Sequence, residues 1–301
     1  MDCNQLSIFA PQRNAYTMKK RIDPKEIATK DLHQYLLGSV APRPIAFVST
    51  VDENGRHNLA PYSFFNAFSS NPPILVFSSN RRVADNTTKD TLHNIEVNKE
   101  CVISVVNYNI MRQMALTSVT FPSEVSEFDK TGLTPVPSEM VNVPAVKESP
   151  VNMECTVKEI ITLGEHGGAG HLIICDVKLI HVDENVIENN RINPHKIDLV
   201  GRMGRSYYVR ASGDAVLTLY QNVVSTPIGY ESLPAIAKKS EILTGNDLGE
   251  LAALETIPDQ AEIDAYHTKV EELGSKVEEY ASSLIKHGQV MEALCLLMAA
   301  E

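Results

Sequence analysis

The chain has 301 residues, 43% of them hydrophobic, and a formal net charge of −11. This length and composition are typical of a globular protein whose core needs no disulfide or metal, and the negative charge argues against a nucleic-acid partner, which usually needs a clustered positive face. No window has the uninterrupted apolar length of a membrane span, so no membrane partner is expected.

The five cysteines form no CxxC pair, and most stand inside apolar runs such as "ECVISVV" and "LIICDV". This placement favours buried free thiols in a reducing compartment, and we therefore expect a cytoplasmic protein without a structural disulfide. The nine histidines are scattered and include no pair at metal-ligand spacing on a predicted helix, so no metal site is expected. Residues 1–20 lack the apolar core of a signal peptide and are interpreted as a disordered leader.

From residue 44 onward the chain is built mainly from short runs with β-strand character. Strands rich in Val, Ile, Phe and Thr are predicted over 44–52, 73–79, 100–108, 151–164 and 171–187. Helices are predicted over "PKEIATKDLHQYLLG" near the start, over "TTKDTLHNIEVN" in the middle, and beyond Pro258. Strands joined by turns, with helices only as inserts, predict a mainly β fold with an antiparallel barrel rather than a doubly wound parallel sheet.

Common nucleotide and hydrolase motifs are missing from the sequence. The Gly-rich segment "GEHGGAG" runs into a strand instead of opening a helix, which excludes a Rossmann phosphate loop there. There is also no P-loop, no G-x-S-x-G and no H-E-x-x-H. Any nucleotide-like ligand must therefore be held by a different kind of site.

The stretch 57–80, "HNLAPYSFFNAFSSNPPILVFSSN", contains no Lys, Arg, Asp or Glu. Its mixture of amides, hydroxyls and aromatic rings suits a planar heteroaromatic ligand with hydrogen-bonding edges, although a half-buried loop whose aromatics fill the core is an alternative. Shortly afterwards, "NTTKD" places hydroxyls and Lys89 at the start of a predicted helix, where free backbone N–H groups favour a phosphate. A simple helix N-cap is the alternative interpretation of "TTKD".

Four segments in the same order resemble the flavin reductase-like family with an FMN-binding split barrel, which includes flavoredoxin. They are "GSVAPRPIAFVSTVDENGRHNLAPYSFFNAFSSNPPILVFS", "KDTLHNI", "GHLIICDVKLIHVDENVI" and "VGRMGRSYYVR". The resemblance covers about residues 21–215 and implies an antiparallel split β-barrel that binds FMN, or FAD, at a homodimer interface. The residues expected to bind the cofactor are Arg43, Ser49, Thr50, Asn58, Pro61, Tyr62, Ser63, Phe64, Phe65, Asn66, Ser78, Ser79, Asn80, Lys89 and Thr91.

The resemblance also implies an oxidoreductase in which NAD(P)H passes a hydride to the flavin, and the flavin passes electrons to a small-molecule or protein acceptor. His171 matches the family's histidine and is the expected catalytic residue, with a role in placing the donor; a strand-end hydrogen bond is the alternative. Of Tyr207 and Tyr208, only one is expected to point inward, because side chains alternate along a strand. Two other functions remain open: an electron-transfer flavoprotein reduced by a protein partner, and a flavin-binding module without turnover.

Beyond residue 215 the resemblance ends. Residues 216–257 are expected to form an extended surface segment and residues 258–301 a helical hairpin. The hairpin is predicted because apolar residues recur at spacings of three and four between Ile263 and Leu284, and because "QVMEALCLLMAA" supplies a second apolar helix after His287 and Gly288. Such a seam is expected to pack on the barrel or on the second copy of a dimer.

Overall fold

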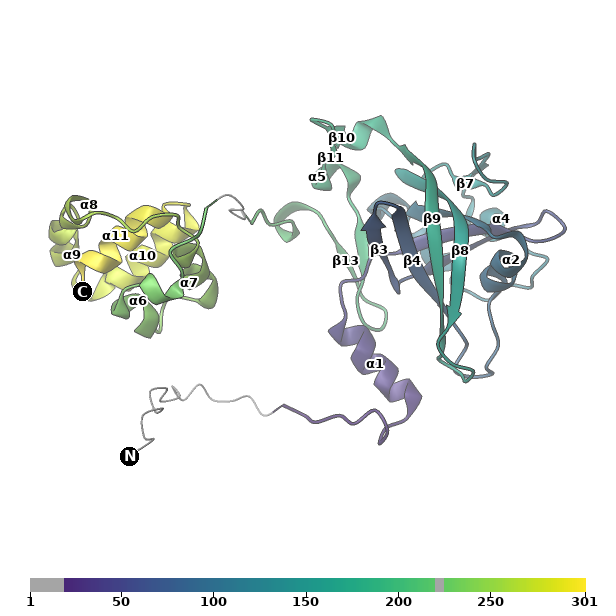
Figure 1. The fold of residues 1–301 in the computed structure, drawn as a ribbon, viewed down its shortest axis with the longest axis horizontal. Helices are drawn as coiled ribbons and strands as arrows, with labels where there is room; N and C mark the ends of the chain where they lie inside the picture. Colours follow the sequence, from purple (N-terminus) through teal and green to yellow (C-terminus); the bar gives the residue numbers. More distant parts are fainter. Residues whose placement is uncertain (1–18, 220–224) are drawn as a thin grey trace, which may run out of the picture. The chain divides into compact units, whose positions relative to one another are not determined.

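The computed structural model describes residues 19–219 and 225–301, which form two compact units that divide between Leu217 and Thr218 (Figure 1). All but the last two residues of the predicted leader, 1–20, lie outside the described residues. Within the described part of the chain, no helix is long and apolar enough to cross a membrane.

The first unit is built on a seven-stranded antiparallel sheet with the strand order β2-β1-β5-β8-β9-β4-β3. Figure 1 shows the run from β3 through β4 and β9 to β8. The prediction of an antiparallel split barrel is confirmed, although the sheet is not closed, because β2 and β3 remain its two edges. The strands are β1 (Ala46–Val51), β2 (His57–Tyr62), β3 (Phe65–Ser70), β4 (Pro73–Asn80), β5 (Glu100–Val105), β8 (Val151–Thr162) and β9 (Gly170–Val182).

The sheet curls around a core to which six of its strands contribute. Val48, Phe77, Ile103 and Ile173 are fully buried in this inner cluster, although their strands are not all neighbours. Alternate residues of β1, such as Phe47, pack instead into an outer cluster with α3 (Met111–Leu116) and α4 (Glu127–Thr131). Because both faces of β1 are covered, its sequence is an unbroken buried run rather than an alternation of buried and exposed residues.

Two helices of this unit frame the candidate site described below. Helix α2 (Asp90–Asn98) inserts Leu92 and Ile95 into the inner cluster, which fixes its N-terminus near the ends of β2 and β4. Helix α1 (Thr29–Ser39) contributes no buried residue. Both helices were predicted. The remaining elements are short: β6 (Pro135–Val136), β7 (Ala145–Val146), β10 (Ile187–Glu188), β11 (Arg191–Ile192), α5 (Pro194–Ile197), β12 (Val200–Arg202) and β13 (Tyr208–Arg210).

The second unit is helical and has its own apolar core. Leu251, Ala281, Leu294 and Leu296 are among its fully buried residues. Its helices are α6 (Ala235–Lys239), α7 (Gly245–Ala252), α8 (Gln260–Asp264), α9 (His267–Leu273), α10 (Val277–Lys286) and α11 (Val290–Ala299).

The expected division of this region differs from the observed one in two ways. Residues 216–257 are not an extended segment throughout, because they include α6 and α7, and a capping box between Thr244 and Asp247 starts α7. The regular seam is not one helix, because α9 ends at Leu273 and Gly274 has a φ of +54°. Left-handed backbone at that glycine interrupts a pattern whose apolar spacing continues across it.

Candidate functional site

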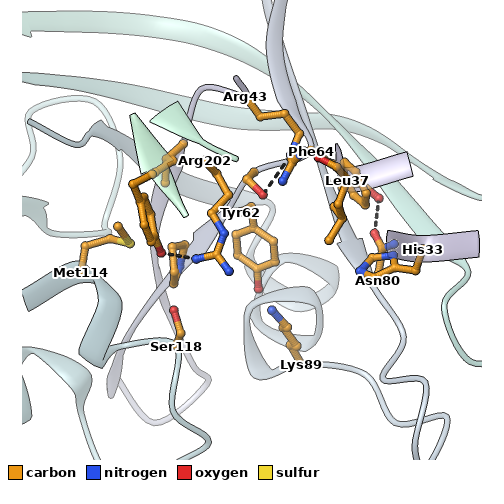
Figure 2. A pocket seen from close by; sticks show the side chains of 15 residues that line it. His33, Leu37, Arg43, Tyr62, Phe64, Asn80, Lys89, Met114, Ser118 and Arg202 are labelled. Atoms are coloured by element: carbon orange, nitrogen blue, oxygen red, sulfur yellow. Dashed lines mark hydrogen bonds between the residues drawn. The ribbon is translucent and has the colours of Figure 1, made fainter. Parts of the chain in front are cut away.

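A cavity of about 280 Å³ opens in the first unit between the ends of β2 and β4, helix α1 and the β12–β13 hairpin (Figure 2). Its walls combine aromatic rings with hydroxyl, amide and cationic groups. The lining residues are His33, Leu37, Arg43, Ile45, Pro61, Tyr62, Ser63, Phe64, Ser78, Asn80, Lys89, Met114, Ser118, Arg202 and Tyr208. We call this space the main cavity.

The main cavity carries only one sign of formal charge. Arg43, Lys89 and Arg202 line it, and none of its lining residues is an aspartate or glutamate. In a chain with a net charge of −11, a cavity lined by three cations is a local exception. Such a cavity favours an anionic ligand, because positive groups without carboxylate partners are available to compensate its charge.

Arg43 holds the walls of the cavity together. It is 4% exposed, and its guanidinium group donates hydrogen bonds to the carbonyl oxygens of Leu37, Val40 and Met203 and to the hydroxyl of Ser63. Burial, followed by the nearby charge of Arg202, lowers the pKa of Arg43. With these partners Arg43 positions α1, the β2–β3 turn and the β12–β13 hairpin around the cavity.

Lys89 lies at the junction of the main cavity and a second one. Its ammonium nitrogen is 4.6 Å from the centre of the Tyr62 ring, and burial, followed by the charge of Arg82, lowers its pKa. Burial also raises the pKa of Tyr62 to about 12, so this phenol keeps its proton at neutral pH. The hydroxyls of Thr91 and Ser79 lie near enough to oppose this shift, but neither they nor any other described residue forms a well-aligned hydrogen bond with the Tyr62 hydroxyl.

The second cavity, of about 180 Å³, shares Pro61, Lys89 and Ser118 with the main cavity. It is rich in hydroxyls and includes both cations and carboxylates. Its other lining residues are Asn58, Ala60, Arg82, Asp90, Thr91, Thr117, Val119, Thr120, Phe121 and Glu127. Asn58 donates hydrogen bonds to the hydroxyls of Thr91 and Thr50, at 2.8 and 3.2 Å.

The structure brings most of the predicted site residues to these two cavities. Those on the main cavity are Arg43, Pro61, Tyr62, Ser63, Phe64, Ser78, Asn80 and Lys89; Asn58 and Thr91 line the second cavity. Asn80 is held in place because it accepts from the Ser78 hydroxyl at 2.9 Å and donates to the Gly168 carbonyl at 3.2 Å. A Cβ at Gly170 would lie 2.6 Å from the Ser78 hydroxyl oxygen, so a larger residue there would force the Ser78 side chain out of its hydrogen bond with Asn80.

Five predicted cofactor-binding residues line neither cavity. Ser49 is buried and donates to the Pro144 carbonyl, whereas Thr50 accepts from Asn58 and Asn94. The other three are Phe65, which packs against the inner cluster, Asn66, which is exposed on β3, and Ser79, which is buried without a hydrogen-bond partner among the described residues. The alternation of β4 separates Ser79 from Ser78, which faces the main cavity.

His171 lies inside the barrel rather than on either cavity. It is 4% exposed, stands opposite Ser79 on the neighbouring strand, and its Nδ1 is 3.1 Å from the Thr162 hydroxyl oxygen. Its Nε2 has no hydrogen-bond partner among the described residues. Burial, followed by the charge of Arg81, lowers the pKa of His171 and favours the neutral ring. Its catalytic role stays a prediction.

Several lining residues were not foreseen from the sequence. They are His33, Leu37, Ile45, Met114, Ser118 and Arg202 on the main cavity, and Arg82, Asp90, Glu127 and the segment 117–121 on the second. The signal for the Arg202 part of the wall was the motif "VGRMGRSYYVR", which contains Arg202 and the two tyrosines. The alternation expected for them is present, because Tyr208 lines the main cavity while Tyr207 is 68% exposed.

Residues 37–200 match the family model described as a flavin reductase like domain. The chain belongs to this family. An uncharacterized protein of Aquifex aeolicus is 39% identical over 194 residues, which cover 64% of this chain and 96% of that protein. Residues 37–200, which match the family model, contain most of the residues that line the two cavities but end just before Arg202 and Tyr208.

Two solved structures are similar to this chain in both sequence and fold. Nitrilotriacetate monooxygenase component B from Bacillus cereus is 34% identical with a TM-score of 0.61, covering 64% of this chain and 96% of that one. The 2-nitrobenzoate 2-nitroreductase of Pseudomonas fluorescens is 27% identical with a TM-score of 0.58, covering 68% of this chain and 99% of that one. The comparisons support a flavin-dependent redox role for the first unit.

Proposed function

We propose that the protein is an oxidoreductase that holds FMN in the two cavities, accepts a hydride from NAD(P)H and passes electrons to an acceptor. The observation that carries this proposal is the main cavity itself, where Arg43 and Lys89 stand among aromatic and amide side chains and no lining residue carries a carboxylate. A planar, anionic cofactor with several hydrogen-bonding edges matches this combination of walls.

The residues present fit a flavin mononucleotide. Lys89 and the hydroxyls of Thr91 and Ser118 are suited to its phosphate, because Lys89 immediately precedes α2, whose first backbone N–H groups have no partner within the helix. Tyr62 and Phe64 supply flat surface for the ring, and the unpartnered Tyr62 hydroxyl is a donor that a ligand can satisfy. FAD is the alternative cofactor.

The bound flavin would supply the hydride and electron chemistry. The work of the chain's own residues would be to orient the ring, exclude water and hold charge. The protonated phenol of Tyr62 is a fixed donor at neutral pH, and Arg43 keeps the surrounding elements rigid through its bonds to three carbonyl oxygens. Rigid walls of this kind favour transfer between correctly placed partners.

We further propose that the protein acts as a homodimer with the flavin at the interface. All residues of β3 after Phe65 are exposed, including Phe68 at 68%, and the nearby α1 exposes Tyr35 and Leu36. An exposed edge strand with a large aromatic residue is a surface that proteins normally cover. A cytoplasmic location is consistent with the buried free thiols of Cys101, Cys155, Cys175 and Cys295.

The test is to purify the full chain and identify its flavin after release by heat. We expect FMN, and we expect NADH or NADPH to reduce the bound flavin under anaerobic conditions. Sedimentation velocity would establish whether the flavin-loaded protein is a dimer. A preparation that neither contains flavin nor takes up added FMN or FAD at micromolar concentration would refute the proposal. Flavin that is reduced only by a protein donor would instead identify an electron-transfer flavoprotein.

A further inference from the structure

The main cavity has two sides of different chemical character. In Figure 2, Leu37, Phe64 and His33 lie on one side of Tyr62, and Met114 and Ser118 lie on the other, beyond Arg202. We define the second side as the Arg202 subsite. It comprises Met114, Ser118 and Arg202, together with Tyr208, which accepts a hydrogen bond from Arg202, and Ile45, which belongs to the same outer cluster as Met114.

Arg202 is held in one orientation. Its guanidinium group donates to the Tyr208 hydroxyl and, at 2.6 Å, to the carbonyl oxygen of Arg205, and its central carbon lies 4.6 Å from the centre of the Tyr208 ring. These contacts use two of the five N–H groups that a guanidinium offers. Within residues 19–219 and 225–301, no carboxylate forms an ion pair with Arg202, so it remains available to an anion.

Apart from the nearby charge of Arg43, the groups around this guanidinium are apolar or neutral. Ile45 and Met114 are almost fully buried and border the cavity with aliphatic atoms, the Tyr208 ring lies against the guanidinium, and Ser118 provides one hydroxyl. A carboxylate accepts two parallel hydrogen bonds from an arginine, and an aromatic ring attached to it would contact the apolar side chains. A hydrated inorganic anion would leave those apolar surfaces unused.

We propose that the Arg202 subsite binds the carboxylate of a small aromatic acid, which is the substrate class of the proposed flavin site. The inference rests on the proposed function, because such a substrate must lie beside a bound flavin. It goes beyond that function by naming a substrate class and the residue that selects it. Arg202 would select a carboxylate over an uncharged amide of the same shape.

The test compares benzoate with benzamide, which has the same ring but no negative charge, and with inorganic phosphate. Binding to the FMN-loaded protein is measured by isothermal titration calorimetry and by the change in the flavin absorbance spectrum. We expect benzoate to bind at least about tenfold more tightly than benzamide, the smallest effect expected from a charge-assisted hydrogen bond. Equal binding of benzoate and benzamide would overturn the inference, as would phosphate binding that is as tight as that of benzoate.

Three variants identify the residue responsible. Arg202→Gln should weaken benzoate binding at least about tenfold and change benzamide binding little, because the neutral, shorter glutamine cannot form the charge-assisted pair that only benzoate uses. Arg202→Lys should keep the preference for benzoate with weaker binding, since an ammonium lacks the planar fork. The matched control is Arg205→Gln, because Arg205 is an exposed cation on the same hairpin that does not line the cavity.

The outcomes also separate this inference from the proposed function. If the protein does not bind FMN, the proposed function fails and this inference fails with it. If Arg202→Gln loses FMN instead of benzoate, Arg202 belongs to the cofactor site, and the inference fails while the proposed function stands. If Arg205→Gln weakens benzoate binding as much as Arg202→Gln does, the effect is one of net charge, and the subsite is refuted.

Discussion

Lys89 offers the most direct test of the proposed cofactor site. It stands where the two cavities meet, 4.6 Å from the centre of the Tyr62 ring, and only burial and a second cation, Arg82, account for its lowered pKa. Replacing it by methionine keeps the apolar stem and removes the charge. We expect Lys89→Met to weaken FMN binding by about 1.5–3 kcal/mol, or about 10- to 150-fold in Kd, which is the usual effect of losing a charged hydrogen-bond partner.

The stability of the flavin-free protein should respond differently. The variant removes a desolvated ammonium, which favours folding, but it also loses the contact with the Tyr62 ring, which is worth about 0.5–2 kcal/mol. Because these effects oppose each other, we expect the free energy of unfolding to change by less than about 1 kcal/mol.

Two measurements separate these effects. Quenching of flavin fluorescence on titration reports the Kd, and urea denaturation of the flavin-free protein reports stability. Lys130→Met, at an exposed lysine that lines neither cavity, is the control. An unchanged Kd together with a clear loss of stability would show that Lys89 serves the start of α2 and not the cofactor.

Three further predictions concern stability and domain structure. Burial lowers the pKa of His171 from 6.5, so protonation of this histidine favours the unfolded state. The melting temperature should therefore fall as the pH drops below 6.5, and His171→Gln should reduce this dependence of melting temperature on pH. Glu154 is fully buried and accepts hydrogen bonds from two backbone N–H groups and a histidine. In urea denaturation, Glu154→Gln should therefore lower the free energy of unfolding by about 2–4 kcal/mol, whereas Glu159→Gln, on the exposed part of the same strand, should leave it unchanged. Removal of residues 218–301 should leave a folded first unit that still binds FMN. Removal of 258–301 should instead cause aggregation, because α6 and α7 then lose α10 and α11, with which they share a core; equal solubility of the two truncated proteins would contradict this division.

The sequence by itself determined the elements that depend on local pattern. Runs of β-branched and aromatic residues between turn residues located the long strands, and the segment "TTKDTLHNIEVN" located α2. The charge-free stretch 57–80 and the family motifs led to the right region, because β2, β4 and the turn after β2 supply one wall of the main cavity.

The tertiary structure decided which side chains face the cavities. Ser78 and Ser79 are neighbours of the same residue type, but one faces the main cavity and the other is buried inside the barrel, because strand side chains alternate and the curl of the sheet decides which face is inside. No local pattern distinguishes these two faces when both residues are small and polar.

Tertiary structure also decided which distant residues act together. Arg43 was expected to touch the cofactor, but most of its hydrogen bonds go to carbonyl oxygens, including that of Met203 on the β12–β13 hairpin. The same hairpin brings Arg202 to the cavity that Lys89 borders, and no sequence spacing links those two cations. Local sequence therefore determined the long strands, α1, α2 and the region of the site, whereas the charge of the cavity arose only when separate elements packed together.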